Sequence, residues 1–227
     1  MAVDKPAGMS VHNAPGEDLC SQISGLLREE DGVEATFGVN PVHRLDKETS
    51  GIILLAYRRD SFRFLSRQFE AGEAKKLYLA LLHGHLAVPE GAEDALVWKW
   101  VLSKTAGGRE NPKGPNPRLP SETRCRVLDH SVHYTLAEIE PLTGRTHQIR
   151  RHAKLAGHPV VGDARYGSTR AIAFLKQNAG FDRLALHAQA ITLRLPGGDA
   201  PVTLKTSGLP DRMRELFEKD QEKGTEA

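Results

Sequence analysis

The stretch "HRLDKETSGIILLA", residues 43–56, places one carboxylate among several basic side chains. Asp46 follows His43 and Arg44 and precedes Lys47, just ahead of an apolar run. Cations near a carboxylate favour its charged form, and only the charged form acts as a nucleophile or a general base. A solvated surface and a stabilising ion pair are the ordinary interpretations of such a cluster. The rest of the chain must decide between these and a catalytic aspartate.

A second segment, "PLTGRTHQIRRHAKLAGHPVVGDARYG" at residues 141–167, is rich in arginine and histidine. Its pattern predicts a helix that is capped by Thr146, runs to about Ala156 and is closed by Gly157. A Gly- and Pro-containing loop follows, and such a loop lets the backbone approach a ligand closely. The segment carries three closely spaced arginines, Arg145, Arg150 and Arg151.

The charge of the chain is unevenly distributed, although its formal net charge is only +2. Residues 1–43 carry 2 basic and 7 acidic groups, whereas residues 145–170 carry 6 basic and 1 acidic. Residues 99–126 repeat the positive bias with 7 basic and 2 acidic groups. Either positive segment alone is typical of a solvated surface. Together they predict one face that meets phosphates of a polyanion.

Composition excludes several classes of protein. A chain of 227 residues with 39% hydrophobic and 26% charged residues is typical of a globular protein. The two cysteines, Cys20 and Cys125, lack the paired spacing of a disulfide framework or a zinc knuckle, which fits a reducing compartment. No stretch approaches the roughly 20 apolar residues of a membrane span. We therefore expect a cytoplasmic protein that has no membrane partner.

The common nucleotide-binding and metallohydrolase motifs are missing from the sequence. His83 and His85 lie two residues apart and could supply two metal ligands from one face of a strand. No compact set of carboxylates accompanies them, so ordinary histidines at the end of a strand are the better interpretation. The sequence predicts neither a metal nor a nucleotide cofactor.

The periodicity of apolar residues predicts an α+β fold with a largely antiparallel or mixed sheet. A tract rich in Gly, Pro, Asn and Lys, residues 103–121, predicts an exposed loop between strands. A hairpin is predicted over residues 191–205, with its turn at Pro196–Asp199. The other predicted elements are helices at 17–30 and 60–72 and strands at 51–57, 76–84, 124–131 and 134–141.

Five segments in this order resemble the RluA-type family of RNA pseudouridine synthases. The resemblance runs from Lys5 nearly to Lys205. It is carried by "DKPAGMSVH" (4–12), "HRLDKETSGIILLA" (43–56), "KKLYLALLHG" (75–84), "PLTGRTHQIRRHAKLAGHPVVGDARYG" (141–167) and "LALHAQAITL" (184–193). Any one of them could arise by chance, but five in the family's order make chance a poor explanation.

The resemblance implies an enzyme without a cofactor that isomerises a specific uridine of structured RNA, either rRNA or tRNA, to pseudouridine. The reaction breaks the C1′–N1 bond, turns the uracil and joins C1′ to C5. It also implies the pseudouridine synthase fold, in which helices flank a curved mixed sheet and the RNA binds in a central cleft. We expect a monomer with one catalytic domain at residues 1–210 and a charged helix or tail at 211–227.

The resemblance also assigns roles to single residues. Asp46 matches the family's catalytic aspartate, Arg150 the arginine that pairs with it, and Tyr78 the tyrosine that stacks on the target base. Arg44 matches the residue that fills the gap left by the flipped uridine, and Leu186 resembles an apolar wall of the uracil pocket. Further residues expected to bind RNA are His43, Lys47, Lys76, Arg145, His147, Arg151 and Arg165.

Two other functions stay open at this point. A non-catalytic RNA-binding protein of the same fold would need the basic surface but not Asp46, Tyr78 and Arg150 together. A glycoside or nucleoside hydrolase usually needs two carboxylates that flank the scissile bond, whereas the motifs here offer one acid among cations. Release of free uracil would identify the hydrolase.

Overall fold

The computed structural model describes all residues except 28–31, 35, 90–94 and 226–227. The described chain divides into two compact units. Unit 1 comprises Met1–Lys76 and Ala188–Gly208, and unit 2 comprises Leu77–His187 and Leu209–Ala227. The boundary between the units falls inside two strands, β4 (Lys75–His83) and β8 (Leu186–Arg194).

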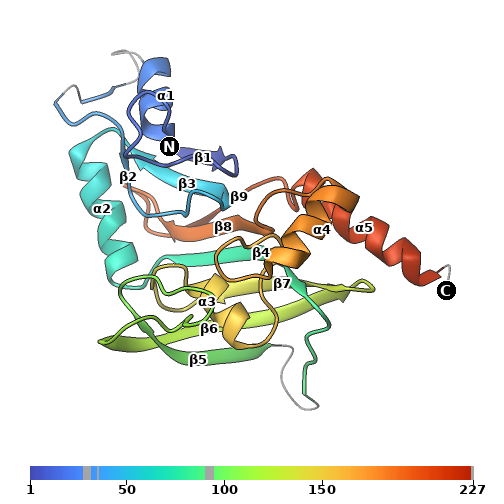
Figure 1. Cartoon of the computed structure of the whole chain (residues 1–227). Coiled ribbons are helices and arrows are strands. Elements are labelled where there is room, and N and C mark those ends of the chain that lie inside the picture. The colour runs from blue at the N-terminus through green and yellow to red at the C-terminus, as the bar shows by residue number, and fades with distance from the viewer. Residues whose placement is uncertain (28–31, 35, 90–94, 226–227) are drawn as a thin grey trace. The chain divides into compact units, whose positions relative to one another are not determined.

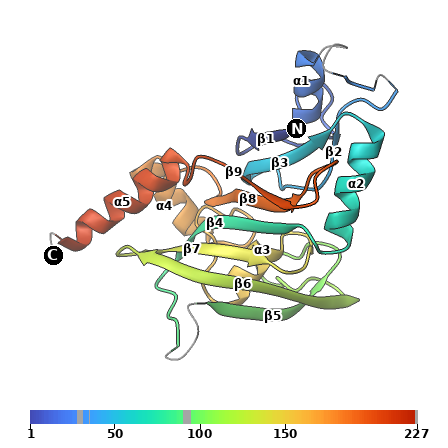
Figure 2. The same cartoon turned by 180° about the vertical axis from the view of Figure 1, so that it is seen from behind.

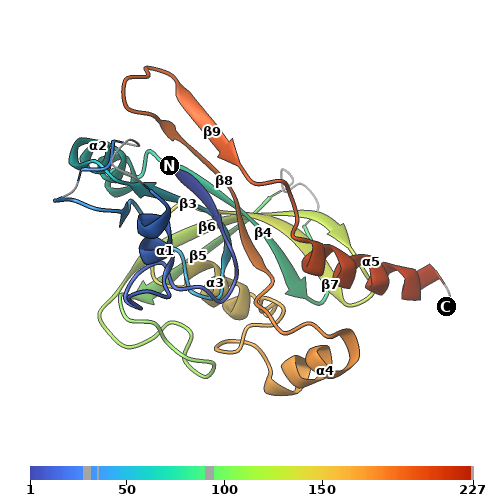
Figure 3. The same ribbon diagram turned by 90° about the horizontal axis from the view of Figure 1, so that it is seen from above.

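Unit 1 is built around β3 (Ser50–Ala56), in which every residue is buried. This strand lies between β1 (Ala2–Lys5) and β8, and it also pairs with the short β2 (Asn40–Pro41). A run such as "SGIILLA" suits this central position, because both faces of the strand are covered. Strand β9 (Pro201–Lys205) forms the predicted hairpin with β8, which stands out clearly in Figure 3.

Two helices complete unit 1, α1 (Leu19–Leu26) and α2 (Arg59–Glu70). Asp18 begins α1, because its carboxylate accepts a hydrogen bond from the Ser21 amide at 2.8 Å. Helix α2 packs against β3 (Figure 2). The apolar core of this unit joins the start of α1 to β3 through Val11, Leu19, Cys20, Ile53 and Leu55.

Unit 2 contains four antiparallel strands in the order β4-β7-β6-β5 (Figure 1). Three of them are β5 (Leu96–Ser103), β6 (Arg118–His130) and β7 (Tyr134–Pro141). The helices of this unit are α3 (Gln148–Leu155), α4 (Thr169–Ala179) and α5 (Asp211–Thr225). Helix α3 packs on β5, β6 and β7, and its Ile149 and Ala153 are buried there.

The predicted α+β class and the largely antiparallel pairing are confirmed. The residues after the predicted tail boundary form helix α5. The helix predicted at 17–30 ends at Leu26, and residues 28–30 lie outside the described part of the chain. A single catalytic domain and a central cleft stay predictions. Among the described residues, no helix is long and apolar enough to cross a membrane.

Two local predictions were wrong. Strand β6 begins at Arg118, within the predicted loop 103–121, because residues 118–121 continue the pairing with β5. Thr146 does not cap α3: its hydroxyl donates to the Lys104 carbonyl at 3.2 Å, and the helix begins after His147, whose side chain makes no capping hydrogen bond. Gln148 secures this helix start instead, since its side chain bonds four neighbouring groups.

Candidate active site

Asp46 lies in the loop between β2 and β3, and this loop is fastened to its own unit. The Lys47 carbonyl accepts hydrogen bonds from the Lys5 ammonium at 3.0 Å and from the Gly8 amide at 2.9 Å. The Asp46 carbonyl accepts from the Thr49 amide at 3.1 Å, and Leu45 packs against the core of unit 1. Asp46 itself is half-buried. The carboxylate therefore projects from a backbone that is fixed on both sides.

The side chain of Lys5 anchors this loop. Its side chain is fully buried, and its ammonium donates to the carbonyls of Pro6 at 2.9 Å, Met9 at 2.9 Å and Lys47. A buried ammonium is costly unless its donors are used. The "DKPAG" segment is thus tied directly to the "HRLD" segment by a side chain.

His43 is not a cation beside Asp46 at neutral pH. Its ring stacks on Phe69 with centroids 4.6 Å apart, and its Nε2 accepts a hydrogen bond from the Leu54 amide at 3.1 Å. Burial of the ring lowers the pKa of His43 to about 4, and the charge of Lys76 contributes in the same direction. Although the residue keeps some exposed surface, its Nε2 is occupied as an acceptor. His43 therefore holds the loop against β3 in its neutral form.

The other unit 1 residues expected to bind RNA differ in exposure. Arg44 and Lys47 are exposed on either side of Asp46. Lys76 is half-buried, and burial lowers the pKa of its ammonium. The structure thus brings Arg44, Asp46 and Lys47 together in one loop and leaves two cations of that loop accessible to an anion.

Arg150 forms a bidentate ion pair with Asp163 inside unit 2. Its Nε lies 2.8 Å from one carboxylate oxygen and its Nη2 lies 2.9 Å from the other. Only 4% of the Arg150 side chain and none of the Asp163 side chain is exposed. Asp163 also accepts from the backbone amides of Arg165 at 2.9 Å and Tyr166 at 3.0 Å. The plane of the guanidinium is therefore fixed.

Tyr166 completes this cluster beneath Arg150. The guanidinium carbon lies 5.4 Å from the centroid of the fully buried Tyr166 ring, and the Tyr166 hydroxyl is 3.1 Å from Nδ1 of His147. Burial raises the pKa of that hydroxyl, so it stays a neutral hydrogen-bonding group. His147 has a left-handed backbone, with φ 52° and ψ 29°, directly before α3. This conformation is uncommon for a residue other than glycine and marks a constrained site.

Tyr78 and Leu186, the remaining predicted pocket residues of unit 2, are both buried. Tyr78 is 9% exposed on β4, where it pairs with Ile139 of β7. Leu186 is 3% exposed at the start of β8. Their roles in base stacking and in the uracil pocket stay predictions.

Two of the three unit 2 arginines that were expected to bind RNA, Arg151 and Arg165, hold the loop formed by residues 104–117. Arg151 is fully buried and donates to the carbonyls of Ser103, Pro112, Lys113 and Thr146. Arg165 donates to the carbonyls of Gly107 and Ala106. Arg145 donates weakly to the carbonyl of Pro120, at 3.4 Å.

The two positive segments use some of their arginines to bind other parts of the protein itself. Hydrogen bonds join the segments 99–126 and 145–170 within unit 2, such as those of Gln148 with Glu122 and Thr123. That they form one face that meets phosphates stays a prediction. Arg151, however, uses its donors on the protein itself and has no exposed surface. Its predicted contact with RNA would therefore need the loop 104–117 to move.

Sequence reasoning missed Lys5, which supports the Asp46 loop in unit 1, and it missed Asp163 and Tyr166, which support Arg150 in unit 2. One signal could have found Asp163, because it is the single acidic residue of the basic segment 145–170. No comparable signal marks Lys5, since a lysine in a short polar segment is usually exposed. Within the described residues, no group of three or more His, Cys, Asp or Glu side chains could hold a metal ion.

The chain is similar to known proteins in both sequence and structure. A family model described as RNA pseudouridylate synthase matches residues 1–155, which include Asp46, Tyr78 and Arg150. Ribosomal large subunit pseudouridine synthase C of Vibrio parahaemolyticus is 36% identical over 206 residues, which cover 88% of this chain and 60% of the relative. The chain thus spans well under two thirds of that relative's length. The tRNA pseudouridine synthase C of Haemophilus ducreyi is 32% identical over 225 residues, which cover 96% of this chain and 90% of the relative.

Two human proteins of known structure are also similar. RNA Pseudouridylate Synthase Domain Containing 4 covers 96% of this chain and 88% of its own with a TM-score of 0.72 and 22% identity. RNA Pseudouridylate Synthase Domain Containing 1 covers 91% of this chain and 79% of its own with a TM-score of 0.66 and 26% identity. The fold of this chain is therefore that of the pseudouridylate synthases.

Proposed function

Because the chain belongs to the family of RNA pseudouridylate synthases, we propose that it isomerises a specific uridine of rRNA or tRNA to pseudouridine. The observation that carries the proposal is the rigid presentation of Asp46. Lys5 and Gly8 hold the backbone on one side of the carboxylate, and His43 holds it on the other. A reacting group that must meet one ribose carbon benefits from such a fixed backbone, since misplacement by about 1 Å can cost a hundredfold in rate.

In the proposed reaction, Asp46 acts as a nucleophile or a base on the ribose of the target uridine. The C1′–N1 bond breaks, the uracil turns, and C1′ joins C5. The hydrogen of C5 leaves as a proton to water, and N1 takes up a proton, so the product has the composition of the substrate. No oxidant, metal or nucleotide is needed to balance this change. Tyr78 is proposed to stack on the uracil and Leu186 to line its pocket.

Arg150 is proposed to pair with Asp46, as the family resemblance implies. A guanidinium has five N–H donors in one plane, and Asp163 uses two of them in the two-pronged contact. The same guanidinium can therefore serve a second carboxylate without losing the first. In this proposal Asp163 fixes the orientation of Arg150, and Arg150 in turn orients Asp46.

The target base must leave its stack, because both C1′ and C5 have to be reached, and flipping costs a few kcal/mol. The exposed Arg44, two residues before Asp46, is proposed to occupy the gap that the base leaves. Lys47 and Lys76 are proposed to contact the neighbouring phosphates. A monomer located in the cytoplasm is part of this proposal.

The experiment follows the bond change, since uridine and pseudouridine have the same mass. RNA labelled with tritium at uridine C5 is incubated with the protein without added metal or nucleotide, and the tritium released to water is counted. Wild-type protein should release tritium. Asp46→Asn keeps the shape of the side chain but removes its charge, so release should stop while RNA binding persists.

The matched control is Asp4→Asn, because Asp4 is an exposed aspartate of the same unit, on β1. This variant should release tritium at the wild-type rate. Release by Asp46→Asn at that same rate would remove Asp46 from the mechanism. Free uracil in the wild-type reaction would indicate a hydrolase, and RNA binding with no tritium release from total cellular RNA would indicate a non-catalytic binding protein.

A further inference from the structure

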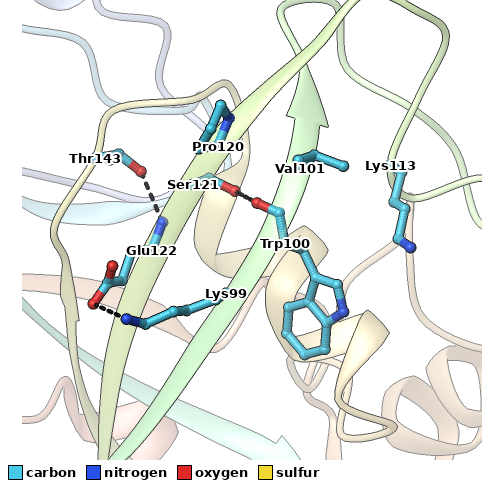
Figure 4. A pocket seen from close by; sticks show the side chains of 8 residues that line it. All are labelled: Lys99, Trp100, Val101, Lys113, Pro120, Ser121, Glu122 and Thr143. Carbon is cyan, nitrogen blue, oxygen red and sulfur yellow. Dashed lines mark hydrogen bonds and ion pairs between the residues drawn. The ribbon is translucent and has the colours of Figure 1, made fainter.

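A hollow of about 450 Å³ opens at the β5 edge of the unit 2 sheet (Figure 4). Lys99 and Trp100 of β5, Lys113 of the loop 104–117 and Glu122 of β6 are among the residues that line it. None of the residues assigned to the reaction lines this hollow. It is therefore separate from the proposed catalytic groups, and its combination of an aromatic ring with two cations needs its own explanation.

Trp100 is held rigidly but is not covered. Alternate residues of a strand point to the same face, and on this face of β5 both Trp98 and Leu102 are buried, at 6% and 0% exposure. Trp100 lies between them and is only half-buried. Its ring meets the buried His152 ring at 5.3 Å in an edge-to-face contact, so the indole is supported from within the unit while it borders the hollow.

Lys113 is held in place through its backbone. The Lys113 carbonyl accepts hydrogen bonds from the buried Arg151 guanidinium and from the Ser103 amide, the latter at 2.9 Å. Arg151 also binds the carbonyl of Pro112, so two successive loop residues are fastened to α3. This fixes where the Lys113 side chain starts, and both Lys113 and Trp100 line the hollow (Figure 4).

The buried charge of Arg151 is linked to the hollow, because its guanidinium donates to the carbonyl of Lys113, which lines the hollow. Among the described residues, Arg151 bonds only to carbonyl and hydroxyl oxygens, so no carboxylate neutralises it. Burial lowers the pKa of Arg151, and the positive charges of Arg118 and Arg165 add to this effect. A polyanion at the rim would relieve this concentration of positive charge. A purely apolar peptide side chain would fit the hollow but would not offset this positive charge.

We propose that the hollow binds one base of single-stranded RNA that flanks the modified uridine. The base stacks on Trp100, and Lys113 contacts a phosphate beside it. Lys99, the neighbour of Trp100 in β5, points to the opposite face of the strand, where it forms an exposed ion pair with Glu122 at 3.4 Å. Stacking on an aromatic ring tolerates any base, so this subsite adds affinity and places the strand without reading its sequence. The proposal rests on RNA being the substrate.

The chain offers a direct readout, because it contains only two tryptophans. In Trp98→Phe the single remaining tryptophan is Trp100, and a base stacked on it should quench its fluorescence. The probe is an oligouridylate of about ten nucleotides, a length typical of single-strand sites. We expect saturable quenching by the oligouridylate and none by free ribose phosphate. An unchanged emission at saturating oligouridylate would overturn the proposal. Wild-type protein gives the same test if Trp98→Phe does not fold.

Affinity is then measured for variants of the hollow. Trp100→Leu should weaken binding of the oligouridylate on the order of tenfold, whereas Trp100→Phe should restore most of it. The matched control is Phe174→Leu, which removes an exposed aromatic of α4 in the same unit. Lys113→Gln should weaken binding and reduce its salt dependence, compared with Lys176→Gln on α4. Equal affinity of Trp100→Leu and Phe174→Leu would also overturn the proposal.

The outcome can be separated from that of the proposed function. Asp46→Asn should still show quenching of Trp100 by the oligouridylate, although it releases no tritium. Quenching by a protein without synthase activity would leave this subsite standing and remove the proposed function. Synthase activity without any quenching would leave the proposed function standing and remove this subsite.

Discussion

Arg150 and Asp163 are joined by two parallel hydrogen bonds, of 2.8 and 2.9 Å, in a part of unit 2 that excludes water. This pair is more than a stabilising contact, because a buried ion pair of this kind is often no more stable than well-packed apolar residues. Asp163 holds one edge of the guanidinium, while the Tyr166 ring lies beneath it. The geometry is suited to keeping an arginine in one orientation for a reaction.

We expect Asp163→Asn to reduce kcat on the order of a hundredfold in the folded protein, because Arg150 loses its orientation. The variant should also lose about 3–5 kcal/mol of unfolding free energy, because one partner of a buried pair is removed. Urea unfolding and tritium release from C5-labelled RNA measure the two effects separately. The matched control is Glu140→Gln, which removes one partner of the more exposed Arg124–Glu140 ion pair on β6 and β7. It should change kcat and the unfolding free energy little. A normal kcat in folded Asp163→Asn would show that Arg150 needs no such support.

A second prediction concerns Arg151 as the anchor of the loop 104–117. Arg151→Met keeps the apolar stem but leaves several carbonyls without a donor, so the unfolding free energy should fall by about 2–4 kcal/mol. Arg145 makes only long contacts to one carbonyl, so Arg145→Met should lower the unfolding free energy by less than about 1 kcal/mol. Limited proteolysis should cut the loop of Arg151→Met first. Equal stability of the two variants would mean that Arg151 does not anchor the loop.

The fold followed from the sequence where apolar residues alternate or cluster, as in β3, β4 and β7. Apolar periodicity reports burial, and burial determines these elements. The start of α3 could not be predicted in the same way, because it depends on Gln148, whose partners Glu122 and Thr123 lie far away in the sequence. Long-range hydrogen bonds of this kind leave no local pattern.

The same limit applies to the site. The motif placed Asp46 in a loop before a strand, and the structure has it there. His43 was grouped with the cations because a histidine beside Arg44 and Lys47 looks basic in sequence. Its charge depends instead on the Phe69 ring and the Leu54 amide, which only the folded chain brings to it.

The neutral state of His43 predicts a dependence of stability on pH. Its pKa in the folded protein is about 4, compared with 6.5 for an unperturbed histidine. Between these values the unfolded chain binds a proton that the folded chain excludes, so stability rises with pH across this window and is lost as pH falls through it. One such histidine contributes at most about 1.4 kcal/mol per pH unit.

Urea unfolding of wild type and His43→Asn at pH 7 and pH 5 measures this contribution. The loss of stability between the two pH values should be smaller in the variant. His152, whose pKa burial also lowers to about 4, titrates in the same window, so part of the wild-type loss should persist. An identical loss in both proteins would show that folding does not lower the pKa of His43.

The last prediction concerns Lys5, which joins the first segment of the chain to the loop of Asp46. Three carbonyl oxygens surround its ammonium at 2.9–3.0 Å, and one of them belongs to Lys47, the residue next to Asp46. Lys5→Met preserves the length of the side chain but removes all three hydrogen bonds. The loop should then lose its fixed position. We expect kcat to fall tenfold or more, because displacing a reacting group by about 1 Å can greatly reduce the rate. Stability should fall by about 1–3 kcal/mol, as expected when buried acceptors lose their donor.

Lys5→Arg should not restore activity, since a planar guanidinium cannot replace a compact ammonium among three converging carbonyls. Lys75→Met, in an exposed lysine of the same unit, is the control and should behave like wild type. Tritium release gives kcat, and quenching of tryptophan fluorescence by oligouridylate reports RNA binding independently. Binding should survive in Lys5→Met, because the hollow beside Trp100 belongs to the other unit. A Lys5→Met protein with wild-type kcat would show that Asp46 is positioned without the help of Lys5.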